Sequence, residues 1–369
     1  MLKSRFWKNF DWWLFAGSLL LSLIGILVIF STNFKAASIA PAIDVRNQII
    51  FLIVALVGFF ILAWLDYRVW SKLTRPLYII MLGLLLLVEF LGKTALGATR
   101  WINLGFFQFQ PSELAKIVLI IVFAKFFSDH YDRLNDPRQV LLSLAYLLLP
   151  LGLVLAQPDL GTGLVLVVIW FTMAATSSMP KRYLVALVAV SVLLLPVGVH
   201  FLKPYQRSRL ETFLRPTANP LGTGYNVVQS TIAVGSGQLL GRGLAAGTQS
   251  QLNFLPSQHT DFIFAVLAEK LGFVGGLILL LLFAALLGRA LVVTYFAQDR
   301  FGFFLGVGIV AMLIFHIVIN VGMNMGIMPV TGIPLPFVSY GGTSLLVSLA
   351  AIGLLESIAI RHRKIQFGV

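Results

Sequence analysis

The sequence predicts an all-α polytopic membrane protein, and two observations support that prediction. Of its 369 residues, 59% are hydrophobic and only 11% are charged, and the mean hydropathy is +0.93. Soluble domains carry about 25% charged residues. The apolar residues also gather in runs of about 17–25, the length that a helix needs to cross a hydrocarbon core of about 30 Å. These runs lack the alternation of a transmembrane barrel, so spanning helices are expected.

Ten of these runs are expected to cross the membrane. In chain order they cover 12–32, 47–65, 76–92, 112–128, 140–156, 160–178, 183–202, 262–288, 302–325 and 339–360. The first run is too long for the apolar region of a signal peptide. The chain 1–369 is therefore predicted to be a single integral membrane domain with one long extracytoplasmic loop at about 203–260. Its Gly, Pro, Asn and Ser content indicates turns and short helices in that loop.

Basic residues distinguish the two sides of the membrane. With the N-terminus inside, the short loops opposite it carry only Lys35, Arg46, Lys93 and Arg100. The cations on the inner side are Lys3, Arg5, Lys8, Arg68, Lys72, Arg75, Lys125, Arg133, Arg138, Lys181, Arg182, Arg289, Arg300, Arg361, Arg363 and Lys364. The positive-inside rule then puts both termini in the cytoplasm. The net charge of +13 is dispersed, so topology explains it better than a nucleic-acid partner does.

A carboxylate stands at the mouth of one apolar run. Asp261 lies in the sequence His259-Thr260-Asp261-Phe262-Ile263-Phe264-Ala265. At the edge of a hydrocarbon slab a charge costs up to about 3 kcal/mol unless a partner, a water-filled cavity or a function compensates. We expect Asp261 in the first turn of the eighth span, at the outer face. It is either a general base, or Asp261 or Thr260 merely caps the helix.

The fourth span opens with a pair of opposite charges. Glu113 and Lys116 are three residues apart and so share a helix face. In an apolar helix they are expected to point toward a cavity or toward each other. A purely structural ion pair explains them equally well. The absence of Cys from the sequence excludes disulfides, thiol nucleophiles and iron–sulfur clusters.

Three outer segments carry further polar residues. Arg100 is suited to a phosphate because its planar fork donates in parallel, while Trp101 beside it is suited to a sugar face or to the interfacial belt. Asp159 lies in a turn, where it could bind a cation or sugar hydroxyls or serve the turn alone. Ser339 opens the last span after three prolines. The apolar stretch 328–336 before it predicts either a re-entrant turn lining a cavity or a stiff outer loop.

Taken together, these motifs resemble the SEDS family, named for shape, elongation, division and sporulation. The matching motifs run in order along nearly the whole chain. They are Arg100-Trp101-Ile102-Asn103-Leu104-Gly105, Gln110-Pro111-Ser112-Glu113-Leu114-Ala115-Lys116, Ala156-Gln157-Pro158-Asp159-Leu160-Gly161-Thr162, His259-Thr260-Asp261-Phe262 and Pro334-Leu335-Pro336-Phe337-Val338-Ser339-Tyr340-Gly341-Gly342. The stretch 247–256 looks like the elongation type more than the division type. Two positions depart from the family: Lys270, where a second Glu is common, and Ser257-Gln258, where relatives often have Glu-Arg.

The resemblance implies a peptidoglycan glycosyltransferase in the bacterial cytoplasmic (inner) membrane. Such an enzyme polymerises lipid II on the outer face during cell elongation and rod-shape maintenance, by direct inversion at the anomeric carbon. It also implies a class B penicillin-binding protein as transpeptidase partner, beside other elongation-complex proteins. The resemblance makes Asp261 the essential catalytic residue and puts Glu113 and Lys116 in a central cavity.

Glu113 and Lys116 are candidates for binding the substrate, and so are the other polar residues. They are Arg100, Trp101, Asp159, His259, Thr260 and Ser339. A lipid pyrophosphate leaving group needs cations such as Arg100, Lys116, Arg207, Arg209 or Arg215, or a divalent metal, for which Mg²⁺ or Mn²⁺ is the expectation. The alternatives are a lipid II flippase, a division- or sporulation-type paralogue, and a non-catalytic scaffold. A carboxylate at an outer water boundary favours an enzyme, since a flippase needs charges deep along its path.

Overall fold

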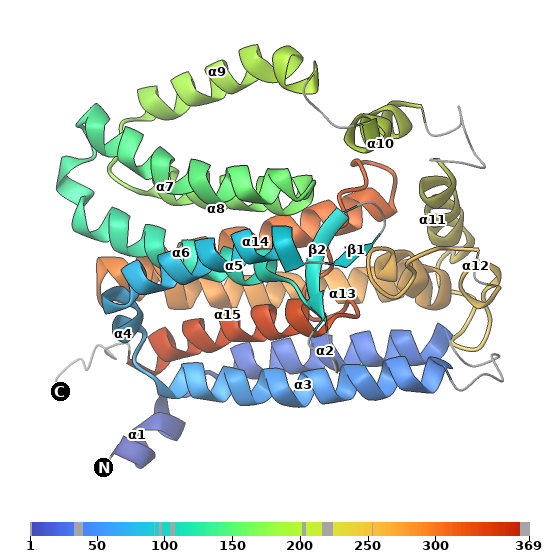
Figure 1. The fold of residues 1–369 in the computed structure, drawn as a ribbon. Coiled ribbons are helices and arrows are strands. Elements are labelled where there is room, and N and C mark those ends of the chain that lie inside the picture. The colour runs from blue at the N-terminus through green and yellow to red at the C-terminus, as the bar shows by residue number, and fades with distance from the viewer. Residues whose placement is uncertain are drawn as a thin grey trace.

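The structure is a computed structural model that describes residues 2–32, 40–91, 93–95, 98–103, 108–200, 204–215, 224–252 and 254–361. These residues are mostly helical (Figure 1). The helices are α1 (Leu2–Asn9), α2 (Trp12–Thr32), α3 (Ala40–Trp64), α4 (Tyr67–Lys72), α5 (Thr74–Leu91), α6 (Pro111–Asp129), α7 (Pro137–Ala156), α8 (Leu160–Thr176), α9 (Lys181–His200), α10 (Pro204–Leu214), α11 (Tyr225–Ser236), α12 (Thr248–Gln251), α13 (Ile263–Tyr295), α14 (Arg300–Asn324) and α15 (Gly342–Arg361). The strands β1 (Lys93–Ala95), β2 (Ala98–Asn103) and β3 (Gln108–Phe109) form an antiparallel sheet in the order β1-β2-β3.

Each of the ten predicted runs coincides with one helix. Six of these helices have the length and apolar composition of membrane spans, namely Trp12–Thr32, Ile43–Trp64, Pro137–Ala156, Ile263–Tyr295, Arg300–Asn324 and Gly342–Arg361. Several predicted ends are wrong. The third helix of the chain begins at Ala40, the last begins at Gly342, and α13 continues to Tyr295. Hydropathy alone does not mark a helix end: α3 and α13 continue through polar residues beyond the apolar run, whereas residues 339–341 before α15 are not helical.

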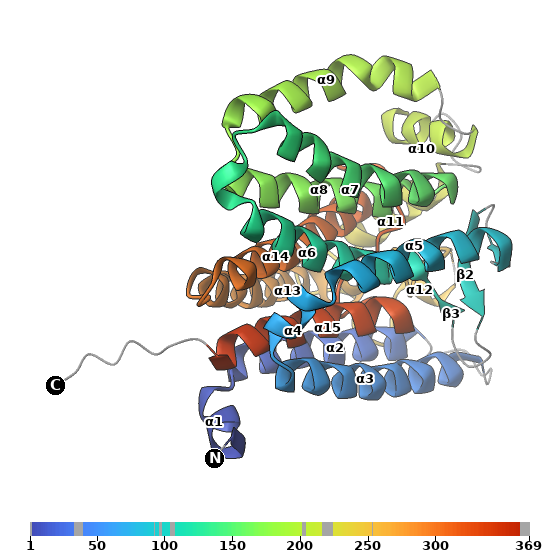
Figure 2. The ribbon, with the colours of Figure 1, turned by 60° about the vertical axis from the view of Figure 1, so that its left-hand side comes forward.

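The centre of the bundle is formed by α6, α14 and α15. Nearly all residues of α15 are buried, and α14 buries most of its length, whereas α3 and α7 expose much of their surface. Figures 1 and 2 show α2 and α3 along one side of this centre and α7 and α8 along the other, with α9 outermost. One end of the bundle carries the small sheet together with α10, α11 and α12, and the opposite end carries α4, α1 and the end of α15.

The predicted outer loop folds against α13. Its described residues form α10, α11 and α12, with turns between α11 and α12, as the composition predicted. Gly272 breaks α13 with φ of +67°, and around this break the main chain pairs with the loop. Phe273 N–H donates to Gln238 O at 2.8 Å, and Arg242 N–H donates to Glu269 O at 3.0 Å. A Cβ at Gly272 would lie 2.6 Å from Leu239 O, so only glycine allows this approach.

The proline-rich segment between α14 and α15 folds into the bundle. Ile333, Leu335 and Val338 are buried, and a Cβ at Gly25 of α2 would lie only 2.5 Å from Val338 O. The irregular backbone therefore packs between helices, as a re-entrant turn would. Protein that surrounds a non-helical backbone is what makes such a backbone viable at membrane depth.

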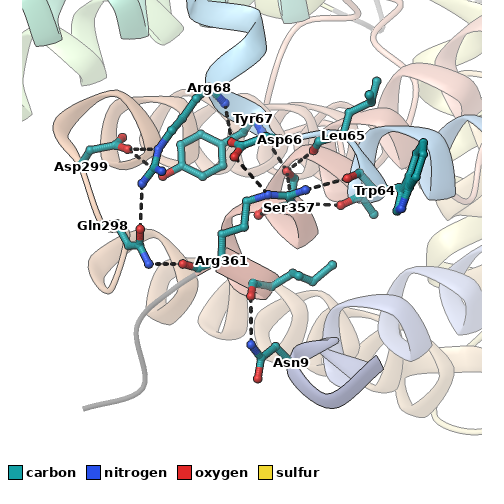
Figure 3. A network of polar contacts seen from close by, with 12 residues as sticks. Asn9, Trp64, Leu65, Asp66, Tyr67, Arg68, Gln298, Asp299, Ser357 and Arg361 are labelled. Atoms are coloured by element: carbon teal, nitrogen blue, oxygen red, sulfur yellow. Dashed lines mark hydrogen bonds and ion pairs between the residues drawn. The ribbon is translucent and has the colours of Figure 1, made fainter. Parts of the chain in front are cut away.

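A polar network ties the elements together at the opposite end (Figure 3). Asp299 caps α14 through Gly302 N–H at 2.7 Å, and its other oxygen accepts from the Tyr67 hydroxyl and from Arg68 Nε, both at 2.8 Å. Burial alone would raise the pKa of Asp299, but these donors together hold the pKa below its usual value. Arg361 at the end of α15 donates to main-chain oxygens of α3, so this end of the bundle is firmly joined.

Candidate active site

Asp261 lies in a turn that ends at the N-cap of α13. The prediction that it sits in the first helical turn is wrong, because Phe262 is the N-cap residue and the helix starts at Ile263. The capping explanation also fails, since within the described residues this N-cap has no side-chain hydrogen bond. The turn is closed by Thr260 N–H and Phe262 N–H, which both donate to Ser257 O at 3.1 and 3.3 Å. Asp261 is partly buried.

The turn is joined to the segment that leads into α15. Ser339 Oγ donates to Thr260 O at 2.7 Å and accepts from Leu335 N–H at 2.8 Å. Tyr340 N–H donates to His259 O at 2.8 Å. The Ser339 hydroxyl, predicted as a substrate contact, thus holds the main chain beside Asp261.

The side chains next to Asp261 point to different partners. His259 Nδ1 lies 3.4 Å from Thr32 Oγ1 at the end of α2. Burial lowers the pKa of His259, and Asp44 acts against this, so the imidazole is neutral at neutral pH. Thr260 Oγ1 donates to Ser257 O at 3.3 Å.

Two arginines supply positive charge around Asp261. Burial raises the pKa of the Asp261 carboxyl above its usual value, and Arg209 of α10 is the strongest influence acting against burial, followed by Thr260 and Arg100. A Cβ at Gly332 would lie 3.6 Å from Asp261 Oδ2 and 3.8 Å from Arg209 Nη1. The carboxylate and the guanidinium therefore border the same point. Arg209 Nη1 also donates to Val330 O at 3.0 Å, which fixes its direction.

Arg100 and Asp159 form a second charged group nearby. Arg100 Nη1 lies 3.7 Å from Asp159 Oδ1, with both side chains largely buried, and Arg100 also donates to Gln157 O and Pro158 O. Asp159 caps α8 by accepting from Thr162 N–H at 3.2 Å and from its hydroxyl at 2.9 Å. Asp159 therefore both caps a helix and pairs with a cation. Its negative charge raises the pKa of Asp261.

Glu113 and Lys116 form a buried ion pair inside the bundle. Lys116 Nζ lies 2.6 Å from Glu113 Oε1, and the two side chains are 1% and 5% exposed. His316 of α14 completes the group, with its Nε2 3.2 Å from Lys116 Nζ. The pair was predicted, but His316 was not. The signal for it was the spacing His316, Asn320, Asn324, which puts three polar residues on one face of an apolar helix.

Comparison with known proteins identifies the family. The sequence profile described as "Cell cycle protein", which covers FtsW, RodA and SpoVE, matches residues 11–364. The chain belongs to this family, the SEDS proteins. It is 40% identical to the peptidoglycan glycosyltransferase MrdB of Escherichia coli, over 94% of both chains. It is 33% identical to the peptidoglycan glycosyltransferase RodA of Treponema pallidum, over 96% of this chain and 98% of that one.

Two solved structures show the same fold. One comes from the structural coordination of polymerization and crosslinking by a peptidoglycan synthase complex. It has a TM-score of 0.80 and 34% identity, covering 95% of this chain and 97% of that chain. The other is the crystal structure of the rod shape determining protein RodA of Thermus thermophilus, with a TM-score of 0.71 and 30% identity, covering 96% and 98%. The SEDS fold is thereby shown for this chain.

Arg100 and Trp101 are neighbours in β2 of this SEDS protein, and successive strand residues point to opposite faces. Arg100 turns toward Asp159. Trp101 is partly exposed, as a residue at a membrane interface would be.

The side chains described do not fit a preformed metal site. Within the described ranges no three His, Cys, Asp or Glu residues gather closely enough to hold an ion. The cationic groups that favour the ionised form of Asp261 are the guanidinium groups of Arg209 and Arg100, which are not metal ligands.

Proposed function

We propose that this SEDS protein uses Asp261 as the general base of a peptidoglycan glycosyltransferase that polymerises lipid II on the outer face of the bacterial cytoplasmic membrane. One observation supports this most directly: the partly buried carboxylate of Asp261 and the guanidinium of Arg209 border one point beside Gly332. A base and a cation side by side match the two needs of the reaction, proton removal from the acceptor and stabilisation of the leaving group.

The chemistry assigns a role to each charge. The acceptor sugar hydroxyl loses its proton to Asp261 as its oxygen bonds to the anomeric carbon of the donor, and the bond from that carbon to the lipid pyrophosphate breaks. Burial raises the pKa of Asp261, which strengthens it as a base, while Arg209 and Arg100 favour its ionised form. The same two guanidinium groups suit the developing charge on the pyrophosphate, because their forks donate in parallel to phosphate oxygens.

The buried trio of Glu113, Lys116 and His316 has a different role in this proposal. Lys116 contacts both Glu113 and His316, and the trio lies between α6 and α14. We assign it to shaping the floor of the cavity beneath the reacting sugars. Among the remaining candidates, Asp159 directs Arg100, and Ser339 supports Thr260.

The topology proposed is one domain over 1–369 with ten spans and both termini in the cytoplasm. The helices proposed as spans are α2, α3, α5 to α9 and α13 to α15. The end that carries α4 and the end of α15 is basic, with Arg68, Lys72 and Arg361, which suits the cytoplasmic side. In this topology Asp261 and the loop 203–260 lie at the other end, on the extracytoplasmic side.

The proposed partner is a class B penicillin-binding protein, acting with other proteins of cell elongation. A structural relative comes from a complex named for coordinated polymerization and crosslinking, and coupling of strand synthesis to crosslinking needs a transpeptidase. The relatives named MrdB and RodA support the elongation role. A Mg²⁺ or Mn²⁺ ion would have to arrive with the pyrophosphate, which can supply the oxygen ligands that the described residues do not gather.

The proposal is tested by giving labelled lipid II to the purified protein, with and without its penicillin-binding partner, in detergent and in sealed vesicles. We expect glycan strands that are resolved on gels, with the label remaining in its original leaflet in the vesicles. Movement of the label between leaflets without polymer would instead identify a flippase and refute the enzyme. Adding a chelator separates a metal requirement from the residue chemistry.

A further inference from the structure

Two asparagines of α14 hold the main chain of the Asp261 turn. Asn320 and Asn324 are four residues apart, so their side chains leave the same face of the helix, and both are fully buried. The Nδ2 of each donates to the carbonyl oxygen of Asp261, at 3.0 Å in both cases. A carbonyl oxygen has two lone pairs, so these two amides satisfy it completely.

Each asparagine also holds a second element. Asn324 Oδ1 accepts from Ala265 N–H at 2.9 Å, a first-turn donor of α13 that has no partner within its own helix. Asn320 Nδ2 donates to Ile333 O at 2.8 Å, next to Gly332. Asn324 thus determines where α13 begins, and Asn320 joins the Asp261 turn to the segment that faces the carboxylate. One pair of side chains therefore holds the Asp261 turn, the start of α13 and the segment at Ile333 together.

This arrangement suits a catalytic base. The oxygens of a base must be available to the substrate, so a base that is held through its carboxylate is a weaker one. Bonds to the main-chain carbonyl hold Asp261 without occupying those oxygens. The two residues before it are held in the same way, since Ser339 Oγ donates to Thr260 O and Tyr340 N–H to His259 O.

We propose that Asn320 and Asn324 are positioning residues that set the height and direction of Asp261 for proton transfer. This inference rests on the proposed function of Asp261 as the base. A base must reach within about 2.6–3.2 Å of the proton that it removes, and a misplacement of about 1 Å costs on the order of 100-fold in rate. The asparagines act on kcat through Asp261 and do not contact the substrate.

The test uses Asn320→Leu and Asn324→Leu, which keep side-chain size and remove the amide. Each variant is purified with the penicillin-binding partner, and kcat and KM for lipid II are obtained from initial rates of strand synthesis. We expect kcat to fall roughly 10- to 100-fold and KM to change by less than about twofold, because only the base is displaced. The rates are divided by the folded fraction of each preparation, because a merely structural role would lower that fraction and leave kcat per folded enzyme near that of the wild type.

Ser230→Ala is the matched control. Ser230 is fully buried, and its Oγ donates to the main-chain oxygen of Asn324 at 2.8 Å. The change removes a buried hydrogen bond from the same helix end and leaves the bonds to Asp261 in place, so kcat should stay near that of the wild type. An equal fall in kcat in this control would overturn the proposal, as would wild-type kcat in both leucine variants.

Three further variants keep the test able to refute the proposal. If the leucine variants do not fold, Asn320→Ser and Asn324→Ser replace them, since the shorter side chain cannot span to the carbonyl, and the same criteria apply. Asp261→Asn is measured in parallel. An active Asp261→Asn refutes the base itself, whereas an inactive Asp261→Asn beside fully active asparagine variants refutes only the positioning role.

Discussion

Replacing Lys116 with methionine should strongly destabilise the protein. The ammonium lies 2.6 Å from Glu113 Oε1, and the two side chains are 1% and 5% exposed. Methionine nearly fills the volume of the lysine stem but leaves the carboxylate without its cation. Breaking a buried ion pair from one side costs about 3–5 kcal/mol, whereas replacing both partners by neutral groups is often close to neutral. We therefore expect Glu113→Gln with Lys116→Met to recover most of the stability that Lys116→Met loses.

Thermal unfolding in detergent and the initial rate of strand synthesis are measured on the two single variants and on the double variant. If the pair shapes the substrate cavity, the double variant regains stability and stays at least about tenfold slower than the wild type. Lys125→Met is the control, because its ion pair with Asp129 is also intrahelical but exposed and is worth at most about 0.5 kcal/mol. Recovery of both stability and activity in the double variant would show that the pair is only structural.

Three more predictions follow from single contacts. Arg209→Gln should slow strand synthesis at least about tenfold. Because Arg209 acts to lower the pKa of Asp261, its loss should move the acid limb of the pH–rate profile to higher pH. The control is Arg242→Gln, at an exposed arginine of the same loop, which should leave that limb in place. Gly25→Ala should lower the melting temperature and the rate of strand synthesis, since the new Cβ would lie 2.5 Å from Val338 O. The control Gly58→Ala should keep the melting temperature of the wild type, because its Cβ would meet nothing within 4 Å among the described residues. Asp299→Ala should lower the free energy of unfolding by about 1–2 kcal/mol at neutral pH, because the helix cap is lost. This difference in stability from the wild type should shrink as the pH falls below about 4, because a carboxylate with a lowered folded-state pKa stabilises the protein only above that range. A difference in stability that is constant with pH would contradict this.

Hydropathy predicted the existence of the helices well and their ends poorly. A hydrocarbon slab imposes a length and an apolar composition that can be read directly from the runs, so each run coincides with a helix. The break of α13 at Gly272 could not be predicted in this way, because it depends on main-chain pairing with residues 238–242 of the preceding loop. Such pairing carries no local sequence signal beyond a glycine in an apolar run.

The charged residues of the site could be predicted because burying them is costly. Asp261 and the Glu113 and Lys116 pair stood out for that reason, and the structure brings Glu113 and Lys116 together. The residues missed were neutral or scattered. Asn320 and Asn324 carry no charge, and His316 had no neighbour in the sequence to suggest that it meets Lys116 from another helix. Their common spacing of four residues places them on one face of α14. This spacing points to a polar site only once α14 is known to be buried.

The central claim is that the carboxylate of Asp261 removes the proton from the acceptor sugar. The most direct measurement compares the single-turnover rate of strand extension in the wild type and in Asp261→Asn, each bound to the partner and saturated with lipid II. An amide of the same shape keeps the fold and cannot accept the proton, so we expect bound substrate, an unchanged melting temperature and a rate lower by at least about 100-fold. Extension by the folded Asp261→Asn variant at a rate near that of the wild type would contradict the account.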